Sequence, residues 1–238
     1  MPDSSPPSQL CPALLTLSLA EIRHIRRTLI RWGRANYQDF PWRRADAGWH
    51  GLIAEVLLQR TRAAAVVPVY EAFVKRYPTP VLLAVAPIEE LEQLLFPLGL
   101  RWRVPRLREL GRALAAAGGS VPRCREKLMR LPLVGEYAAA AWLSLHAGKR
   151  AVIVDANVVR WLCRLTGQVY DGETRRKRWL LTLADSLTPR TGVRRYNLSV
   201  LDFTMKVCTA RPSCPSCPFA AGGCVFARKE AEVAVRVA

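Results

Sequence analysis

Four cysteines near the end of the chain have the spacing of a metal-binding loop, Cys208-x5-Cys214-x2-Cys217-x6-Cys224. Deprotonated thiols are strong ligands for soft metals, and one short loop can bring four of them around a single centre. Two disulfides or a structural zinc ion would also account for these cysteines, and spacing alone does not separate zinc from an iron–sulfur cluster. We interpret the loop as one metal site.

Two carboxylates upstream of the loop are candidates for catalysis. Asp155 follows the apolar residues 151–154 and opens a predicted helix, so it suits a helix N-cap as well as a carboxylate at the edge of a cleft. Glu55 lies with Gln59 and Arg62 on one stripe of an apolar helix, and that stripe either is solvated or lines a cleft. None of the three histidines belongs to a metal-like cluster, which favours carboxylate chemistry over a histidine-based nucleophilic triad.

The segment Leu-Pro-Leu-Val-Gly at 131–135 forms a tight turn between two short predicted helices. A helix–hairpin–helix can point backbone N–H groups at a phosphate, and the dipole of the following helix adds to the attraction. A plain connection between helices explains the segment equally well.

The composition indicates a polyanionic partner. The chain has 238 residues and a formal net charge of +17, which favours nucleic acid, although binding to ribosomes or to a membrane surface would also explain the charge. No apolar run is long enough to span a bilayer. The Pro- and Ser-rich residues 1–18 are predicted to be a disordered tail and not a signal peptide. Seven cysteines without export signals indicate a reducing cytoplasm.

Apolar residues recur at helical spacing along most of the chain, and no segment alternates as a strand does, so we predict an all-α fold. The expected helices cover residues 17–34, 51–65, 67–76, 88–95, 104–117, 123–130, 137–147, 156–166, 175–186 and 196–207.

Five segments together resemble one family. They are Phe-Pro-Trp-Arg at 40–43, Ala-Glu-Val-Leu-Leu-Gln-Arg-Thr at 54–61, Leu-Pro-Leu-Val-Gly-Glu-Tyr at 131–137, Val-Asp-Ala-Asn-Val-Val-Arg at 154–160 and the cysteine loop. They resemble the helix–hairpin–helix DNA glycosylase superfamily, which includes endonuclease III and the adenine glycosylases. The resemblance extends over about residues 20–227, and the residues at 155–157 and 197–203 are most similar to the thymine/uracil mismatch glycosylases.

The resemblance implies a two-lobed all-α fold. A six-helix barrel with the hairpin would occupy residues 40–150, a discontinuous iron–sulfur lobe 19–39 and 151–227, and a C-terminal tail 228–238. A monomer would bind mismatched double-stranded DNA in the cleft between the lobes, at the nucleoid in the cytoplasm. A [4Fe-4S] cluster is the implied cofactor, held by Cys208, Cys214, Cys217 and Cys224.

The resemblance also implies roles for single residues. Asp155 matches the catalytic aspartate, Glu55 the glutamate of the base pocket, and Tyr137 the position that decides lyase activity. Gln59 and Leu100 are the candidates for filling the gap that a flipped base leaves.

Further expected DNA contacts are Leu133 and Gly135 of the hairpin and Arg211 of the cysteine loop. Two departures from the family pattern affect these regions. Leu133 replaces the first glycine of the family's Leu-Pro-Gly-Val-Gly, and Leu would be strained there if the position requires a positive φ. The cysteine spacing x5, x2, x6 replaces the usual x6, x2, x5, with the outer span unchanged.

The residues also suggest a reaction. A base inside a duplex must be extruded before an enzyme can reach it, most cheaply at a mismatch. Breaking its glycosidic bond leaves positive charge on the sugar, which Asp155 would stabilise while Glu55 hydrogen-bonds or protonates the departing base. A lysine at 137 could form a Schiff base, but Tyr137 cannot, so we predict a monofunctional glycosylase.

We expect the substrate to be thymine or uracil opposite guanine. The alternative is an adenine glycosylase acting opposite guanine or 8-oxoguanine, for whose usual second C-terminal domain we expect no room in the 14 residues after Cys224. A more remote alternative is a non-catalytic iron–sulfur protein that binds DNA.

Overall fold

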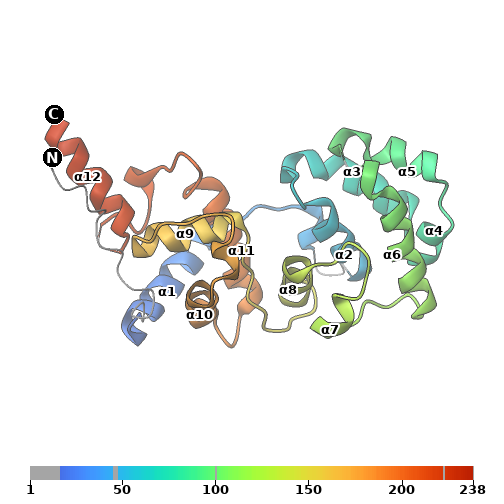
Figure 1. The fold of residues 1–238 in the computed structure, drawn as a ribbon, viewed down its shortest axis with the longest axis horizontal. Coiled ribbons are helices and arrows are strands. Elements are labelled where there is room, and N and C mark those ends of the chain that lie inside the picture. Colours follow the sequence, from blue (N-terminus) through green and yellow to red (C-terminus); the bar gives the residue numbers. More distant parts are fainter. Residues whose placement is uncertain (1–16, 45–47, 100, 222, 238) are drawn as a thin grey trace, which may run out of the picture. The chain divides into compact units, whose positions relative to one another are not determined.

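The computed structural model describes residues 17–44, 48–99, 101–221 and 223–237, and within these ranges it contains helices and no β-strand (Figure 1). The all-α prediction is therefore confirmed. Leu100 and nearly all of the predicted N-terminal tail lie outside the described residues. The helices are α1 Leu19–Ala35, α2 Gly48–Leu57, α3 Ala63–Arg76, α4 Pro80–Ala84, α5 Ile88–Leu95, α6 Val104–Ala116, α7 Arg125–Leu128, α8 Glu136–Leu145, α9 Ala156–Thr166, α10 Arg178–Leu187, α11 Val193–Lys206 and α12 Val225–Val237.

The chain divides into two compact units. The first unit consists of residues 1–35, 154–188 and 199–238, and the second unit consists of residues 36–153 and 189–198. Residues 189–198, which we expected in the iron–sulfur lobe, thus belong to the second unit. Their contacts explain this, because Arg194 Nε donates to the carbonyl of Leu145 at 2.7 Å and Asn197 Nδ2 to the carbonyl of Ala151 at 3.1 Å.

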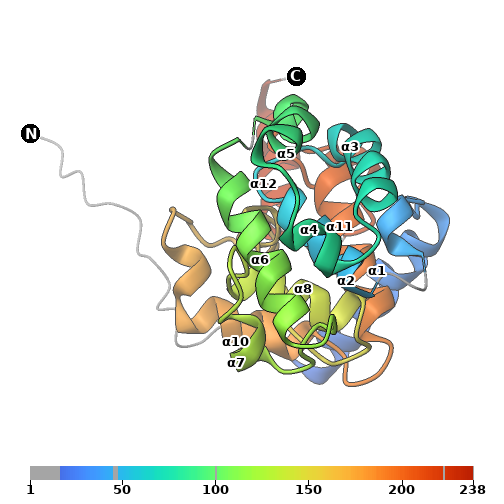
Figure 2. The ribbon, with the colours of Figure 1, turned by 90° about the vertical axis from the view of Figure 1, so that its right-hand side faces the viewer.

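The core of the second unit is built around α2, in which every residue from 51 to 57 is buried. Helices α3 and α8 pack against α2 (Figure 1), and Trp142 Nε1 on α8 donates to the carbonyl of Gly48 at 2.9 Å. A second contact joins α4 to α6 (Figure 2). A Cβ at Gly111 of α6 would lie 2.9 Å from the backbone nitrogen of Ala84, so only glycine allows this close approach.

The core of the first unit is aromatic. Trp161 of α9 and Trp32 of α1 pack edge-on against Phe203 of α11, which also contacts Phe219 of the cysteine loop. Helix α1 presses closely on α11, because a Cβ at Gly33 would lie 2.1 Å from Ser199 Oγ. None of the helices in the described ranges is both long and apolar enough to cross a bilayer.

Three segments differ from the sequence prediction. The helix expected over 51–65 ends at Leu57, and α3 begins only at Ala63. The short helix α4 forms where we expected only a connection, because Thr79 Oγ1 accepts the N–H of Leu82 and Pro80 suits a first helical turn. Of the residues assigned to a C-terminal tail, those from 228 to 237 belong to α12, which packs against α9.

Candidate active site and cysteine loop

Glu55 is buried in the middle of α2, with a side-chain exposure of 3%. The interpretation of its stripe as solvated is therefore wrong for this residue. Its Oε1 lies 3.2 Å from Nε2 of His146, which follows the last residue of α8 and is equally buried, also at 3%. Within the described chain the Glu55 carboxyl has no other hydrogen-bond or ion-pair partner. The site thus contains a buried carboxyl held at one oxygen.

The chain leaves α2 through a strained turn that carries Gln59. Arg60 has a φ of 61°, a left-handed conformation that is uncommon outside glycine, and it explains why the helix stops. The buried Arg103 donates from one nitrogen to the carbonyls of Val56 and Gln59, both at 3.2 Å, and so satisfies the end of the helix. Burial and the nearby charge of Arg60 lower the pKa of the Arg103 guanidinium.

The hairpin turn between α7 and α8 is hydrogen-bonded to the turn that follows α2. Leu133 adopts a φ of 64°, so the position does require the conformation that a glycine adopts most easily. Its carbonyl accepts a hydrogen bond of 3.0 Å from Gln59 Nε2. The side chain of Leu133 packs against the core of the second unit, which compensates in part for the strained backbone.

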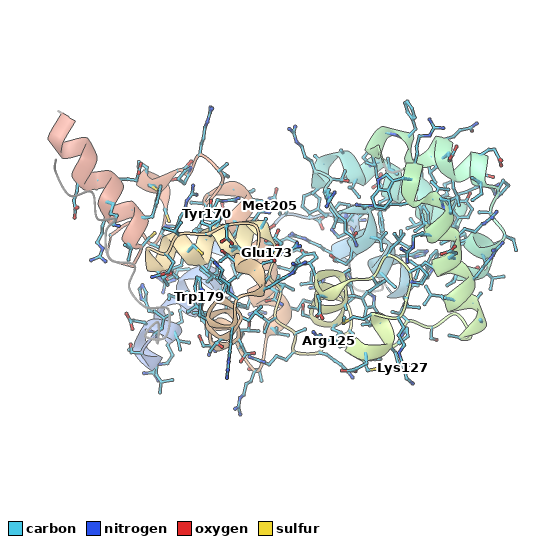
Figure 3. The ribbon with its side chains drawn as sticks, in the orientation of Figure 1. Arg125, Lys127, Tyr170, Glu173, Trp179 and Met205 are labelled. Atoms are coloured by element: carbon cyan, nitrogen blue, oxygen red, sulfur yellow. The ribbon has the colours of Figure 1, made fainter. Side chains whose placement is uncertain are left out.

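The hairpin ends at Gly135, the N-cap of α8. Gly135 is exposed, and a Cβ built on it meets no atom within 4 Å. The first N–H groups of a helix have no acceptor within the helix, so those at the start of α8 suit an anion. Arg125 and Lys127 extend from α7, on the other side of the turn (Figure 3), and Arg125 Nε donates to Glu136 at 3.0 Å.

Tyr137 lies one residue into α8 and is partly buried. Lys149 is the first lysine after the hairpin. Its Nζ donates to the carbonyl of Arg123 at 2.6 Å. The Lys149 amine is therefore engaged in a hydrogen bond within the second unit.

Asp155 is the N-cap of α9 in the first unit. Its Oδ1 accepts the N–H of Val158 at 2.7 Å, and its Oδ2 accepts from Asn157 Nδ2 at 2.8 Å. The N-cap interpretation is confirmed. It leaves the catalytic one open, because the side chain is only partly buried and its two oxygens are held in a fixed orientation.

The four cysteines of the loop line one pocket in the first unit. Most of the rest of its wall is aromatic or aliphatic, including Trp161, Phe203 and Phe219, and Arg164 and Ser213 also line it. All four thiols are free of disulfides, which argues against the disulfide alternative. Four thiols around one apolar pocket fit a group that binds thiolates.

Two arginines of α9 support this pocket. Arg160 donates to the carbonyl of Cys208 at 2.8 and 2.9 Å, and Arg164 directs a guanidinium nitrogen at the sulfur of Cys208, at 3.7 Å. Burial raises the pKa of the Cys208 thiol and raises that of Cys217 to about 11. These thiols would ionise at neutral pH only with a positive partner such as a metal.

The predicted site residues fall on both units. Glu55, Gln59, Tyr137 and the hairpin lie in the second unit, whereas Asp155, the cysteines and Arg211 lie in the first. Arg211 is exposed, with its carbonyl accepting from Thr209 Oγ1. In the described part of the chain, no three His, Cys, Asp or Glu side chains are arranged to hold a single metal ion.

Sequence reasoning missed two residues of the site. His146 was set aside because it belongs to no cluster of histidines, and Arg103 was one of many arginines. A signal for His146 does exist in the sequence, because Gly51 stands inside an apolar helix one turn before Glu55. A glycine there is unfavourable unless something packs closely against it.

Comparison with known proteins gives consistent matches. Residues 53–181 match the profile of the HhH-GPD superfamily of base excision DNA repair proteins. A thymine/uracil-DNA glycosylase of Pyrobaculum aerophilum is 38% identical over 217 residues, which cover 87% of this chain and 94% of that protein. The human adenine DNA glycosylase is 35% identical over 84% of this chain, which spans only 39% of that protein.

Solved structures agree with the sequence matches. The structure of a thermostable thymine-DNA glycosylase has a TM-score of 0.81 and 33% identity, and the match covers 88% of this chain and 98% of that one. A non-covalent complex of endonuclease III with DNA has a TM-score of 0.77 and 28% identity, over 91% of this chain and all of the other.

Proposed function

Because the chain belongs to the HhH-GPD superfamily of base excision DNA repair proteins, we propose that it is a monofunctional DNA glycosylase that removes thymine or uracil opposite guanine. The observation that carries the proposal is the likeness to a thymine/uracil-DNA glycosylase over 94% of that protein's length. The same matches confirm the predicted resemblance to this superfamily and, within it, to the thymine/uracil mismatch glycosylases.

In the proposed reaction, Asp155 offsets the positive charge that develops on the sugar as the glycosidic bond breaks. The hydrogen bonds from Val158 and Asn157 orient its carboxylate, so little reorganisation is needed when the charge appears. Glu55 hydrogen-bonds or protonates the departing base, which needs a proton or a donor because the bonding electrons stay with it. Water then adds to the sugar and leaves an abasic site.

The hydroxyl of Tyr137 cannot form an imine with the opened sugar, so the proposed enzyme does not cut the strand by β-elimination. In DNA binding, the N–H groups at the start of α8 would receive a backbone phosphate, helped by Arg125 and Lys127. Arg211 would contact a second phosphate, and Gln59 with Leu100 would fill the gap in the duplex. The enzyme would act as a monomer on chromosomal DNA at the nucleoid.

We propose a [4Fe-4S] cluster as the group held by Cys208, Cys214, Cys217 and Cys224. A cluster of several iron atoms fits thiols that are spread around an apolar pocket. When bound, it would fix the loop that carries Arg211.

The proposal is tested with duplexes that contain G·T, G·U, A·G or A·8-oxoguanine pairs. We expect abasic sites from G·T and G·U, seen as strand breaks only after alkali or heat. Preference for adenine opposite 8-oxoguanine would support the adenine glycosylase alternative, which the 35% identity to the human enzyme keeps in view. DNA binding without excision of any base would support the non-catalytic alternative.

A further inference from the structure

Glu55 is placed in the core in a way that stability alone does not explain. A carboxylate can accept about four hydrogen bonds, and leaving a buried one partly unsatisfied is unfavourable. Here only Oε1 has a partner among the described residues, and that partner is the side chain of His146. Apolar residues fill the neighbouring positions of α2, so an apolar residue at 55 would suit the core better.

The imidazole of His146 has a place prepared for it on α2. A Cβ at Gly51 would lie 2.5 Å from Nδ1 and 2.7 Å from Cγ of His146, so any other residue at 51 would displace the ring. Glycine inside a helix is less stable than alanine, and this contact with the ring explains why glycine stands there. Gly51 and Glu55 are one helical turn apart, and the ring spans them with Nε2 at the carboxyl.

We propose that His146 is the positioning residue of Glu55: it holds Oε1 and thereby presents Oε2 to the base that leaves. This inference rests on the proposed function, since it assumes that Glu55 serves the departing base. It adds the residue that follows α8 to a site for which the sequence suggested carboxylates alone.

The chemistry of the pair supports this role. An ionised carboxylate only accepts hydrogen bonds, so Nε2 of His146 carries the proton when Glu55 is ionised. In the excision step the bond from the sugar to the base breaks, its electron pair stays on the base, and Glu55 supplies a proton from Oε2. The new carboxylate is stabilised at once by the N–H of His146 on Oε1. Water then gives its hydroxyl to the sugar and its proton to Glu55, which restores the acid.

Two nearly isosteric variants separate the hydrogen bond from packing. Gln and Met have similar shapes, but only the Gln amide can donate to Oε1. We expect His146→Met to lower the single-turnover excision rate on a G·T duplex by about tenfold or more, a part of what a general acid typically contributes. His146→Gln should retain most of the rate. The Kd for the same duplex should stay within about twofold in both variants, because the pair acts on the chemical step and not on DNA binding.

A matched control removes a second hydrogen bond, which runs from α8 to α2. Trp142→Phe eliminates donation to the carbonyl of Gly48 and leaves the Glu55–His146 pair intact. It should lower the melting temperature and leave the single-turnover rate near that of the wild type. An equal loss of rate in Trp142→Phe and His146→Met would show that loosening of α8 is responsible, and would overturn the inference.

A double-mutant cycle tests whether His146 acts through Glu55. In a Glu55→Gln background, His146→Met should have little further effect on the rate, because the group that it positions is gone. A full additional loss in that background, or a wild-type rate for His146→Met alone, would overturn the inference while leaving the proposed function in place. A wild-type protein that excises no base would instead overturn the proposed function.

Discussion

The side-chain amide of Gln59 donates a hydrogen bond of 3.0 Å to the carbonyl of Leu133, and so joins the turn after α2 to the hairpin. Left-handed residues that are not glycine occur at both ends of this bond. Arg60, which follows Gln59, has a φ of 61°, and Leu133 itself has a φ of 64°. Gln59, expected to fill a gap in the duplex, is therefore held against the expected phosphate-binding turn. This bond couples the two segments of the second unit that we expect to contact DNA.

The strain at Leu133 predicts an inverted order of stability for two variants. Leu133→Ala and Leu133→Gly remove nearly the same packing, but only glycine relieves the positive φ. We expect the glycine variant to be more stable than the alanine variant by about 1 kcal/mol, measured by urea unfolding. Glycine is normally the less stable of the two inside ordered segments, so the usual order would show that position 133 is not strained in solution.

The space around Gly135 predicts that Gly135→Ala folds as well as the wild type. A Cβ there meets no protein atom, and the φ of −94° is open to alanine. If a phosphate approaches the start of α8, the added methyl group would obstruct it and weaken duplex binding at any sequence by about tenfold, or about 1.4 kcal/mol. Fluorescence anisotropy with matched and mismatched duplexes measures this.

Gly172→Ala is the control for that prediction, because a Cβ at Gly172 also meets no protein atom within 4 Å and the residue lies in the first unit. It should leave both stability and affinity unchanged. Equal affinities of all three proteins would remove Gly135 from the DNA contacts.

Local signals predicted most of this molecule, and the failures have identifiable causes. The helix over 156–166 was predicted at its observed bounds, and the structure shows Asp155 capping it and Gly167 ending it with a φ of 75°. The stop of α2 at Leu57 was missed because the turn that follows it is held by Arg103, which is distant in sequence and donates to the carbonyls of Val56 and Gln59. The partnership of Glu55 with His146 was missed for the same reason, since 91 residues separate the two.

The iron–sulfur cluster proposed for the cysteine pocket predicts that the purified protein is yellow-brown. Charge transfer from thiolate to iron should give broad absorbance near ~400 nm. Cys217→Ala should lose the colour and melt at a lower temperature, because its thiol lines the pocket. Cys124→Ala, a free cysteine of the second unit, should keep both properties. Colourless, fully active protein with one zinc ion per chain would contradict the cluster.

The two roles of Asp155 can be separated with Asp155→Asn. Asn is also a good N-cap and can accept the N–H of Val158, so the free energy of unfolding should change little. A neutral amide cannot offset the charge on the sugar, and the single-turnover excision rate should fall about 100-fold or more. Duplex binding should persist. A rate close to that of the wild type would leave Asp155 with its role as a helix cap alone.

The position of Tyr137 predicts the product of the reaction. The wild-type protein should leave an intact abasic strand that breaks only after alkali or heat, since a phenol forms no imine with the sugar. Tyr137→Lys should gain strand cleavage and become trappable on the DNA with borohydride, because it places an amine in the first turn of α8. Denaturing gels with and without borohydride measure both properties.

Lys149 is the main alternative amine that could attack the sugar, and its Nζ donates a hydrogen bond to the carbonyl of Arg123. If the wild-type protein is trapped by borohydride, an amine other than one at 137 attacks the sugar, and Lys149→Ala identifies whether it is this one. We expect no trapping of the wild type and no effect of Lys149→Ala on the Tyr137→Lys adduct. Failure of Tyr137→Lys to form any adduct, in a variant that still excises the base, would mean that residue 137 does not reach the sugar.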